Sequence, residues 1–221
     1  GLDYSALKKI NPKLIYCSIT GFGQTGPYAN RPGYDFLIQG MGGLMSITGE
    51  PDSPDNKTAG PVKVGVAVTD LFTGLYAANA IQGALLERHQ SGLGQYIDLA
   101  LLDVQAAVLA NQASNYLIGN LVPERLGNAH PNIVPYQAFA TADSHIIIAV
   151  GNDQQFARFC KVIESPLMAE DTLYASNATR VHNRQALCES ISVSPRQKDS
   201  RQWLAAFEAN DVPCGPINSI D

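Results

Sequence analysis

The residue of this chain best suited to carry out chemistry is Asp70, which stands where a short β-branched segment gives way to a long apolar helix. An aspartate at the start of a helix commonly caps it by accepting backbone N–H hydrogen bonds. The same junction lies at the carboxyl edge of a sheet, where α/β proteins bind ligands, and a helix N-terminus favours an ionised carboxylate. An ionised Asp70 could attack a carbonyl carbon while neighbouring amides stabilise the oxyanion. Position alone leaves the capping and the nucleophilic roles both open.

Two loops hold the other candidate residues. Gly21, Gly23 and Gly26 match G-x-G-x-x-G after a predicted strand, but no helix opens within the motif, as a dinucleotide site requires. We therefore expect either a loop that passes close to a ligand or a simple turn. Of the four histidines, His130 is the one in a loop bounded by glycine and proline, where binding residues concentrate. His130 is accordingly a candidate binding residue.

Composition narrows the classes of partner. The chain has 221 residues, of which 45% are hydrophobic and 16% charged, and a formal net charge of −5 with no run of lysine or arginine. A surface for nucleic acid or anionic membrane would need such a run. The four cysteines lie far apart, which predicts free thiols in a reducing compartment and no bound metal. With no membrane-length apolar run and no secretory signal, we expect a cytoplasmic protein, or one of the mitochondrial matrix if eukaryotic.

Strands and helices alternate over the first part of the chain. Leu71, Leu75, Ala78, Ile81 and Leu85 share one face of the helix that begins at Asp70, so this face is predicted to be buried. The alternation favours an α/β layer with parallel strands. The pattern predicts helices over residues 5–10, 34–47, 70–91 and 101–118, strands over 14–20, 62–68 and 95–99, and a polar surface loop over 50–61.

The pattern changes after Pro131. Residues 136–140 and 146–150 flank a short polar turn and predict a β-hairpin. Helices are predicted over 154–163, 178–192 and 201–208. We place a boundary near residue 125, between an α/β domain and a smaller α+β domain.

Five stretches of the first hundred residues stand out as a set: NPKLIYCSITGFGQTGP at 11–27, RPGYD at 31–35, GGLMSITG at 42–49, VGVAVTDLFTGLY at 64–76 and GLGQYID at 92–98. Together they closely resemble the class III coenzyme A transferases, the CaiB/BaiF family. GNAHP at 127–131, IVPYQAF at 133–139, VHNR at 181–184 and VPCGPIN at 212–218 look most like its succinyl-CoA:glutarate CoA-transferase branch. The resemblance runs along nearly the whole chain in family order.

The resemblance implies a fold. Residues 1–125 would be part of a Rossmann-like large α/β domain that binds coenzyme A and carries the catalytic aspartate. Residues 126–221 would form the smaller α+β domain. Members of the family are much longer than this chain, which would correspond to their middle part. They form homodimers in which the two chains are interlocked rings.

The resemblance also implies an activity, because the family's catalytic aspartate falls on Asp70. Its carboxylate would attack the thioester of an acyl-CoA and form an aspartyl anhydride, releasing the coenzyme A thiolate. Coenzyme A would pass to a free carboxylic acid, which we expect to be a dicarboxylate of succinate or glutarate size. Acyl-CoA and coenzyme A are thus the expected substrates, with no metal, nucleic acid or membrane as partner.

The family's coenzyme A contacts fall on four consecutive residues, Pro32, Gly33, Tyr34 and Asp35. Arg31 beside them is a candidate phosphate ligand, although a solvated surface arginine fits the sequence equally well. In the family's racemase branch a histidine takes the place of Tyr34 and acts as base toward an α-proton. A tyrosine is a poor base at neutral pH, so transfer of coenzyme A is favoured over racemisation.

Asn128 and His130 stand where formyl-CoA transferases carry a glycine-rich loop. This departure argues against formyl or oxalyl substrates and would allow His130 or Asn128 to line the acyl pocket. Two other functions stay open. One is exchange of the α-proton of a 2-methylacyl-CoA, as in the racemase branch. The other is a non-catalytic subunit or module that binds coenzyme A.

Overall fold

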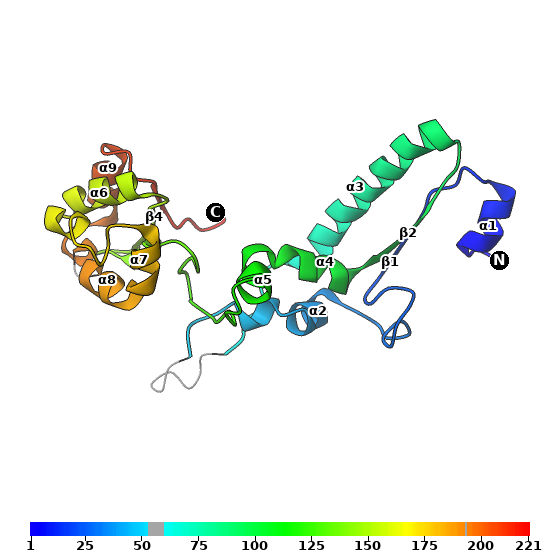
Figure 1. Cartoon of the computed structure of the whole chain (residues 1–221), viewed down its shortest axis with the longest axis horizontal. Coiled ribbons are helices and arrows are strands. Elements are labelled where there is room, and N and C mark those ends of the chain that lie inside the picture. The colour runs from blue at the N-terminus through cyan, green and yellow to red at the C-terminus, as the bar shows by residue number, and fades with distance from the viewer. Residues whose placement is uncertain (53–59, 193) are drawn as a thin grey trace. The chain divides into compact units, whose positions relative to one another are not determined.

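The computed structural model describes residues 1–52, 60–192 and 194–221. They divide into two compact units, Gly1–Arg125 and Leu126–Asp221, each with a sheet of its own (Figure 1). Most of the polar loop predicted over residues 50–61 lies outside the described residues.

The first unit is built on two parallel strands, β1 (Tyr16–Thr20) and β2 (Tyr96–Ala100). Tyr16 lies opposite Tyr96, and Thr20 opposite Ala100. The parallel pairing predicted from the alternation of strands and helices is thereby confirmed. The helices of the unit are, in chain order, α1 (Tyr4–Ile10), α2 (Asp35–Met41), the 3-10 helix η1 (Leu44–Ser46), α3 (Val68–Ser91), α4 (Leu101–Val108) and α5 (Ala110–Leu117).

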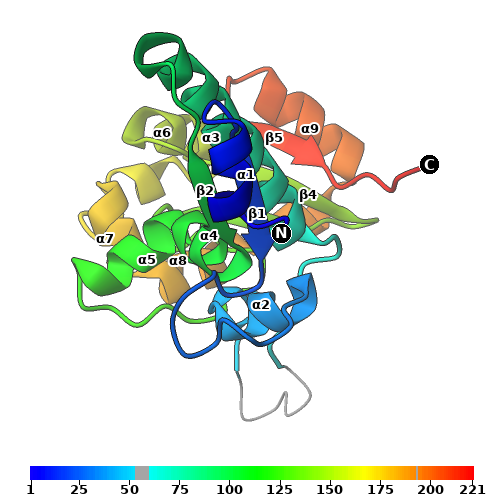
Figure 2. The same cartoon turned by 90° about the vertical axis from the view of Figure 1, so that its right-hand side faces the viewer.

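The longest helix, α3, packs against β1, β2 and α4, and Figure 2 shows it behind the two strands. It ends at Gly92, whose left-handed φ of 73° lets its N–H reach the carbonyl of Arg88. Glycine adopts this C-cap conformation without steric cost. The chain then enters β2, so α3 and the loop before it form the crossover between the two parallel strands.

Three predicted helices are each divided in two. The helix predicted over 34–47 becomes α2 and η1, because Gly43 takes a left-handed φ of 86°. The helix over 101–118 becomes α4 and α5, with Ala110 at a φ of 48°. The helix over 178–192 becomes α7 (Asn177–His182) and α8 (Arg184–Ile191), separated by Asn183. An apolar period continues through one or two non-helical residues, so the pattern does not register these breaks.

The prediction of a strand over residues 62–68 is wrong. This segment is extended but belongs to neither sheet, and α3 begins within it at Val68, two residues before the predicted start. The N–H of Val64 donates to Oε1 of the buried Gln39 at 2.9 Å. The Val64 N–H, which in a sheet would donate to a neighbouring strand, therefore donates to a side chain of α2 instead.

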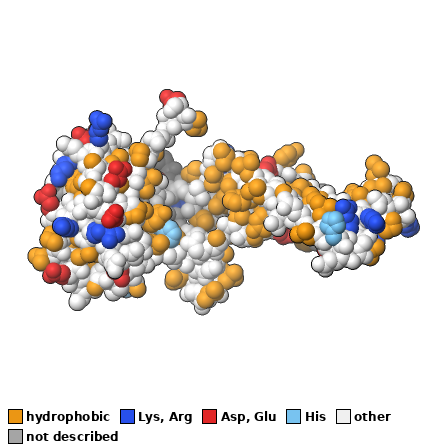
Figure 3. Space-filling view, turned by 90° about the horizontal axis from the view of Figure 1, so that it is seen from above, with side chains coloured by type: hydrophobic (Ala, Val, Ile, Leu, Met, Phe, Trp, Pro, Cys, Tyr) orange, Lys and Arg blue, Asp and Glu red, His pale blue; other side chains and the backbone are white. Residues whose placement is uncertain are grey.

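The buried face of α3 also differs from the prediction. Leu71 and Leu75 are 60% and 66% exposed, whereas the buried residues are small: Thr69, Thr73, Ala77 and Ala84. Short side chains allow α3 to lie close to the elements beneath it, and the leucines point away from them. Hydrophobic side chains accordingly stand at the surface of this unit (Figure 3).

The second unit has the predicted hairpin, β3 (Tyr136–Ala140) and β4 (His145–Ala149), and a third strand that the sequence analysis missed, β5 (Cys214–Pro216), antiparallel to β4. Trp203, Phe207 and Phe159 stack in its core, with ring centroids 5.5 and 5.7 Å apart. Besides α7 and α8, the helical elements of the unit are α6 (Asp153–Val162), η2 (Pro166–Ala169), η3 (Pro195–Gln197) and α9 (Ser200–Glu208).

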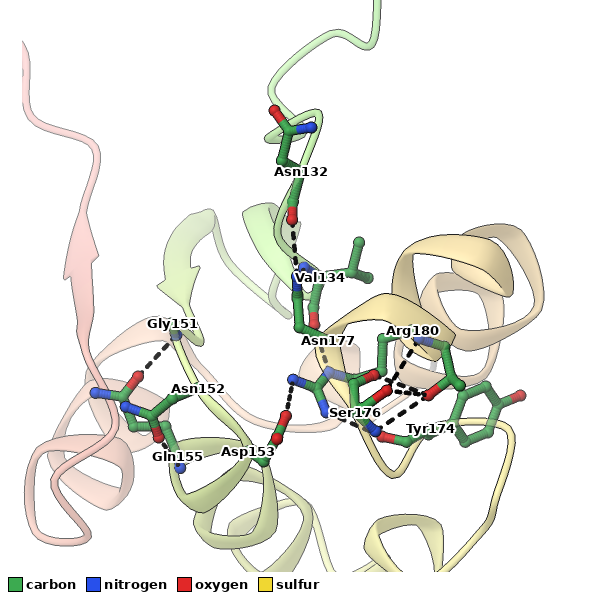
Figure 4. Close-up of polar contacts among 11 residues, drawn as sticks. Asn132, Val134, Gly151, Asn152, Asp153, Gln155, Tyr174, Ser176, Asn177 and Arg180 are labelled. Atoms are coloured by element: carbon green, nitrogen blue, oxygen red, sulfur yellow. Dashed lines mark hydrogen bonds and ion pairs between the residues drawn. The ribbon is translucent and has the colours of Figure 1, made fainter. Parts of the chain in front are cut away.

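A buried arginine, Arg180 of α7, joins three segments of the second unit (Figure 4). Its Nε donates to the carbonyl of Val134 at 2.8 Å, and its Nη1 to the carbonyl of Tyr174 at 2.9 Å. Its Nη2 donates to Oδ1 of Asp153 at 2.7 Å. The guanidinium also lies 4.4 Å from the ring centroid of Phe156. Each of the three guanidinium nitrogens thus donates a hydrogen bond, which offsets the cost of burying the charge.

All four cysteines, Cys17, Cys160, Cys188 and Cys214, are free thiols. Burial raises the pKa of Cys160 to about 12, so this thiol stays protonated. Over the described ranges, no group of three or more His, Cys, Asp or Glu side chains could hold a metal ion. None of the helices in the same ranges is both long and apolar enough to cross a membrane.

Replacing Arg180 with alanine should destabilise the second unit by about 3 kcal/mol, because the buried carbonyl of Val134, the part-buried carbonyl of Tyr174 and the Asp153 carboxylate lose their partner. Arg201→Ala, at an exposed position of α9, is the matched control and should change stability by no more than about 0.5 kcal/mol. Urea unfolding followed by the fluorescence of Trp203, the single tryptophan of the chain, measures both. Equal midpoints for the two variants would contradict the role given to Arg180.

Candidate active site

Asp70 is the third residue of α3 and is exposed to solvent. It does not cap the helix: the N-cap position is Ala67, whose N-cap side chain makes no hydrogen bond. The capping role left open by the sequence is therefore wrong. The Asp70 carboxylate remains available for another role.

The side chain that does cap α3 comes from Asp35, the first residue of α2. Its Oδ1 accepts the N–H of Thr69 at 2.8 Å and, more weakly, the N–H of Asp70 at 3.4 Å. These are the second and third N–H groups of α3, the ones that a capping residue ordinarily satisfies. The backbone of Asp70 is thus attached to a carboxylate 35 residues earlier in the chain.

Two buried glutamines complete this arrangement. Gln39 donates through Nε2 to Oδ2 of Asp35 at 2.7 Å and holds Val64 through its other amide atom. Gln105 of α4 accepts the Thr69 hydroxyl through Oε1 at 2.5 Å. Asp35, Gln39 and Gln105 thus fix the segment from Val64 to Asp70, and we call these three side chains the α3 clamp.

The clamp depends on a glycine at the end of α2. A Cβ added at Gly42 would overlap Cγ of Gln105 and stand 2.8 Å from the carbonyl oxygen of Ile38. The φ of Gly42 is −84°, which any residue can adopt. Its absence of a side chain, and not its backbone freedom, is therefore what allows Gln105 to reach Thr69.

The electrostatic setting of Asp70 differs from the one expected of a helix N-terminus. Partial burial and the negative charge of Asp35 raise the pKa of Asp70 above its ordinary value. A helix dipole alone would lower it. Because a more basic carboxylate is a stronger nucleophile, the shift favours attack by Asp70 whenever it is ionised.

The segment with the predicted coenzyme A contacts follows a closed loop. A Cβ on Gly21 would come 2.5 Å from Cα of Gly33, so glycine at both positions lets the start and the end of the loop meet. No helix begins between them, as expected from the sequence. Pro32 is exposed and Gly33 half-buried.

Arg31 and Tyr34, like Pro32, are exposed to solvent. The Arg31 guanidinium lies 4.5 Å from the ring centroid of Tyr28 and 5.6 Å from that of Phe22. None of the ion pairs among the described residues includes Arg31, so its charge is open to an anionic ligand. Tyr34 is 76% exposed and directly precedes Asp35. Of the predicted contacts, the structure connects Asp35 to Asp70 by hydrogen bonds.

His130 and Asn128 lie in the second unit, on a loop supported by α7 and α8. Arg184 donates to the carbonyls of His130 and Pro131, both at 2.8 Å. Nδ1 of His130 accepts the N–H of Asn132 at 3.1 Å. Burial and the charge of Arg184 lower the pKa of His130. The imidazole is therefore neutral at pH 7 and carries its proton on Nε2, whereas Asn128 is exposed.

Sequence analysis missed the two glutamines of the α3 clamp. One signal was present: Asp35 and Gln39 are four residues apart, the spacing at which side chains on a helix meet. Gln105 offered no comparable signal, because its partner Thr69 belongs to a different helix.

An exposed carboxylate of raised basicity at the start of a crossover helix is a group that could act as a nucleophile. The comparison with known families is specific. This chain belongs to the CoA-transferase family III, whose family model matches residues 1–221.

Two curated relatives illustrate the similarity. The succinate–glutarate CoA-transferase of Agrobacterium fabrum is 56% identical over 221 residues, which are 100% of this chain and 54% of that protein. The succinyl-CoA:glutarate CoA-transferase of Mus musculus is 47% identical over 220 residues, 100% of this chain and 49% of that protein. The chain thus spans about half the length of the curated relatives it matches.

A solved structure agrees in fold. The crystal structure of a CAIB/BAIF family protein from Brucella suis is 52% identical, with a TM-score of 0.78. The match covers 99% of this chain and 56% of that one. The mixed α/β fold is thus that of the CaiB/BaiF family.

Gly42→Ala should lower the stability of the first unit by about 1–3 kcal/mol, because the added methyl group displaces Gln105 from Thr69. Gly40→Ala is the matched control: its Cβ would lie 3.6 Å from Sδ of Met45, an ordinary contact, inside α2. Alanine should stabilise α2 there by up to about 1 kcal/mol. Thermal unfolding by circular dichroism measures both. The same midpoint for both variants would show that Gly42 is not required for close packing.

Proposed function

We propose that this chain carries the nucleophile of a coenzyme A transferase, which moves coenzyme A between an acyl-CoA and a free dicarboxylic acid. The observation that carries the proposal is the Asp70 carboxylate: exposed, more basic than usual, and fixed through its backbone by Asp35. A carboxylate suits this chemistry because the anhydride it forms is reactive enough to pass its acyl group to another nucleophile.

The first half of the reaction begins at the donor thioester. An oxygen of Asp70 forms a bond to the thioester carbonyl carbon, the C–S bond breaks, and coenzyme A leaves as its thiolate. The thiolate then attacks the side-chain carbonyl carbon of the Asp70 anhydride and expels the donor acid as its carboxylate. Asp70 is left as a thioester of coenzyme A.

The second half reverses these steps with the acceptor acid. Its carboxylate attacks the Asp70 thioester, releases the thiolate and forms a second anhydride. The thiolate takes the acyl group of the acceptor, and the Asp70 carboxylate is regenerated. One acyl-CoA and one carboxylate are exchanged for another such pair, so atoms and charge balance. Water must be excluded while an anhydride is present, because it would hydrolyse it.

Binding is assigned to two sets of residues. Pro32, Gly33, Tyr34 and Asp35 contact coenzyme A, Asp35 through its main chain, because both of its carboxylate oxygens already accept hydrogen bonds within the unit. The Arg31 guanidinium, stacked on Tyr28 and without a carboxylate partner among the described residues, binds a phosphate. Asn128 and His130 line the acyl pocket, where the neutral Nε2–H of His130 donates to an acyl carboxylate. This assignment rests on the resemblance and on the chemistry of the side chains.

Residues 1–125 are proposed to be part of a Rossmann-like large domain that binds coenzyme A, and residues 126–221 a small α+β domain, in an interlocked homodimer. In the described part of the first unit, β1 and β2 each have one neighbouring strand, which leaves their outer edges open. Leu71 and Leu75 are large apolar side chains exposed to solvent, and we expect another protein surface to cover them. Both features are expected if further chain, or a second copy, completes the unit. The cytoplasm or the mitochondrial matrix is the proposed location.

The proposed acids are dicarboxylates of four or five carbons. This choice comes from the names of the relatives that are 56% and 47% identical, which act on succinate or succinyl-CoA and glutarate. The racemase function is less well supported, because Tyr34 occupies the position of the histidine base, and tyrosine as a residue type is a poor base at neutral pH.

The full-length protein incubated with succinyl-CoA and glutarate should form glutaryl-CoA and succinate. Asp70→Asn keeps the size of the side chain but removes the nucleophile, and should lower kcat by at least about 10³-fold. Asp103→Asn is the matched control, since Asp103 is also an exposed third residue of a helix, α4, in the same unit. Liquid chromatography of the acyl-CoA pool measures all three proteins.

Three results would contradict the proposal. Full activity of Asp70→Asn would show that Asp70 is not the nucleophile. Uptake of deuterium into a 2-methylacyl-CoA from heavy water, without exchange of acids, would favour the racemase function. Tight binding of coenzyme A by wild-type protein with no turnover of any acid would favour a binding module.

As the pH is lowered, the rate of transfer should begin to fall at a higher pH than it would if the pKa of Asp70 were that of an ordinary aspartate. The ionised carboxylate is the reactive form, so activity is complete above the pKa of Asp70 and is lost as the pH falls through it. Because that pKa is raised, the acid limb of kcat/KM moves upward. A pH profile of wild-type transfer measures it. An acid limb at or below the ordinary aspartate range would show that neither burial nor Asp35 acts on Asp70.

A further inference from the structure

Asp35 is placed to act on Asp70 in two ways, through hydrogen bonds and through charge. Its Oδ1 accepts the N–H groups of Thr69 and Asp70, and its Oδ2 accepts Nε2 of Gln39 at 2.7 Å. The Gln39 side chain is fully buried, so the residues packed around it hold it in place. Asp35 is therefore a fixed support and not a freely rotating surface acid.

We propose that Asp35 is the positioning residue of the reaction, which holds the turn that carries Asp70 and supplies the negative charge that makes the Asp70 carboxylate a strong nucleophile. This inference rests on the proposed function. It gives Asp35 a role other than the coenzyme A contact implied by the family resemblance.

The geometric part follows from where the cap originates. An N-cap residue ordinarily belongs to the same helix and moves with it. Here the cap belongs to α2, so the orientation of the first turn of α3 is set by the packing of two helices. A displacement of about 1 Å at a reacting group can cost about 100-fold in rate. The turn before Asp70 is fixed additionally by Gln105, which accepts the Thr69 hydroxyl.

The electrostatic part follows from the charges around α3. Among the elements packed against it, α2 carries Asp35, α4 carries Asp103, β2 carries Asp98 and β1 carries no charged residue. Of these groups, Asp35 is the one whose charge raises the pKa of Asp70. A neighbouring anion disfavours the ionised form of a carboxylate and makes it more basic.

The test uses the full-length protein and the variant Asp35→Asn. The asparagine Oδ1 can still accept the N–H of Thr69, but the charge is gone and Nδ2 faces Nε2 of Gln39. We expect kcat to fall about 10- to 100-fold with the KM for acyl-CoA within about twofold of wild type. The acid limb of the pH profile should move to lower pH, because the charge acting on Asp70 is lost.

Asp199→Asn is the matched control. Asp199 caps α9 by accepting the N–H of Gln202 at 2.8 Å, which is the same kind of contact in the other unit. It should change stability alone and leave both kcat and the pH profile unchanged. A shift of the profile is a readout that a purely structural cap would not give.

The outcomes separate this inference from the proposed function. If wild-type protein transfers coenzyme A and Asp35→Asn changes only the KM for acyl-CoA, or changes nothing, Asp35 is not a positioning residue. If wild-type protein transfers nothing, the proposed function fails first. Should Asp35→Asn not fold, Asp35→Glu decides: it keeps the charge but displaces the cap, so kcat should fall with the acid limb unmoved. An unchanged kcat in Asp35→Glu would overturn the inference.

Discussion

The hydrogen bond from the Thr69 N–H to the Asp35 carboxylate, 2.8 Å long, connects the two helices on which the site depends. A helix leaves its first N–H groups without partners, and α3 begins at residues that supply no capping side chain of their own. Because the cap comes from α2, the first N–H groups of α3 have this partner only when α2 is packed beside them. The loop closed by Gly21 and Gly33 leads directly into α2. The phosphate-binding candidate Arg31 and the proposed nucleophile are therefore supported by one continuous piece of structure.

Small residues allow this structure to close. Gly42 leaves room for Gln105, and Thr69, Thr73, Ala77 and Ala84 let α3 lie close to its neighbours. The consequence is that the larger apolar residues of α3, such as Leu71 and Leu75, face outward. An exposed apolar face of this kind is what an interaction surface would present, which is the role we propose for it. It is consistent with a chain that spans about half the length of its curated relatives.

Most elements were predictable from the sequence because their signals are local. Alternation gave the hairpin of β3 and β4, and the polar-to-apolar transition located the start of α3 to within two residues. Apart from the divided helices, whose breaks are local, the failures described here share a physical cause, which is that long-range contacts decided the outcome. The extended segment 62–68 joins no sheet because a side chain of α2 takes the Val64 N–H. The buried face of α3 was misjudged because hydrophobicity predicted the leucines inside, whereas close approach of helices required the small residues. The position of Asp70 as a candidate was clear from sequence, but its cap belongs to a helix 35 residues earlier.

The central claim is that the carboxylate of Asp70 becomes covalently acylated. Mass spectrometry of the full-length protein, mixed with succinyl-CoA and then trapped with hydroxylamine, tests it most directly. An anhydride or thioester at Asp70 is attacked at its side-chain carbonyl and leaves a hydroxamate on that residue. The account predicts this modification on the peptide containing Asp70, dependent on acyl-CoA. Turnover of acyl-CoA with no hydroxamate at Asp70, or with one at a different carboxylate, would contradict it.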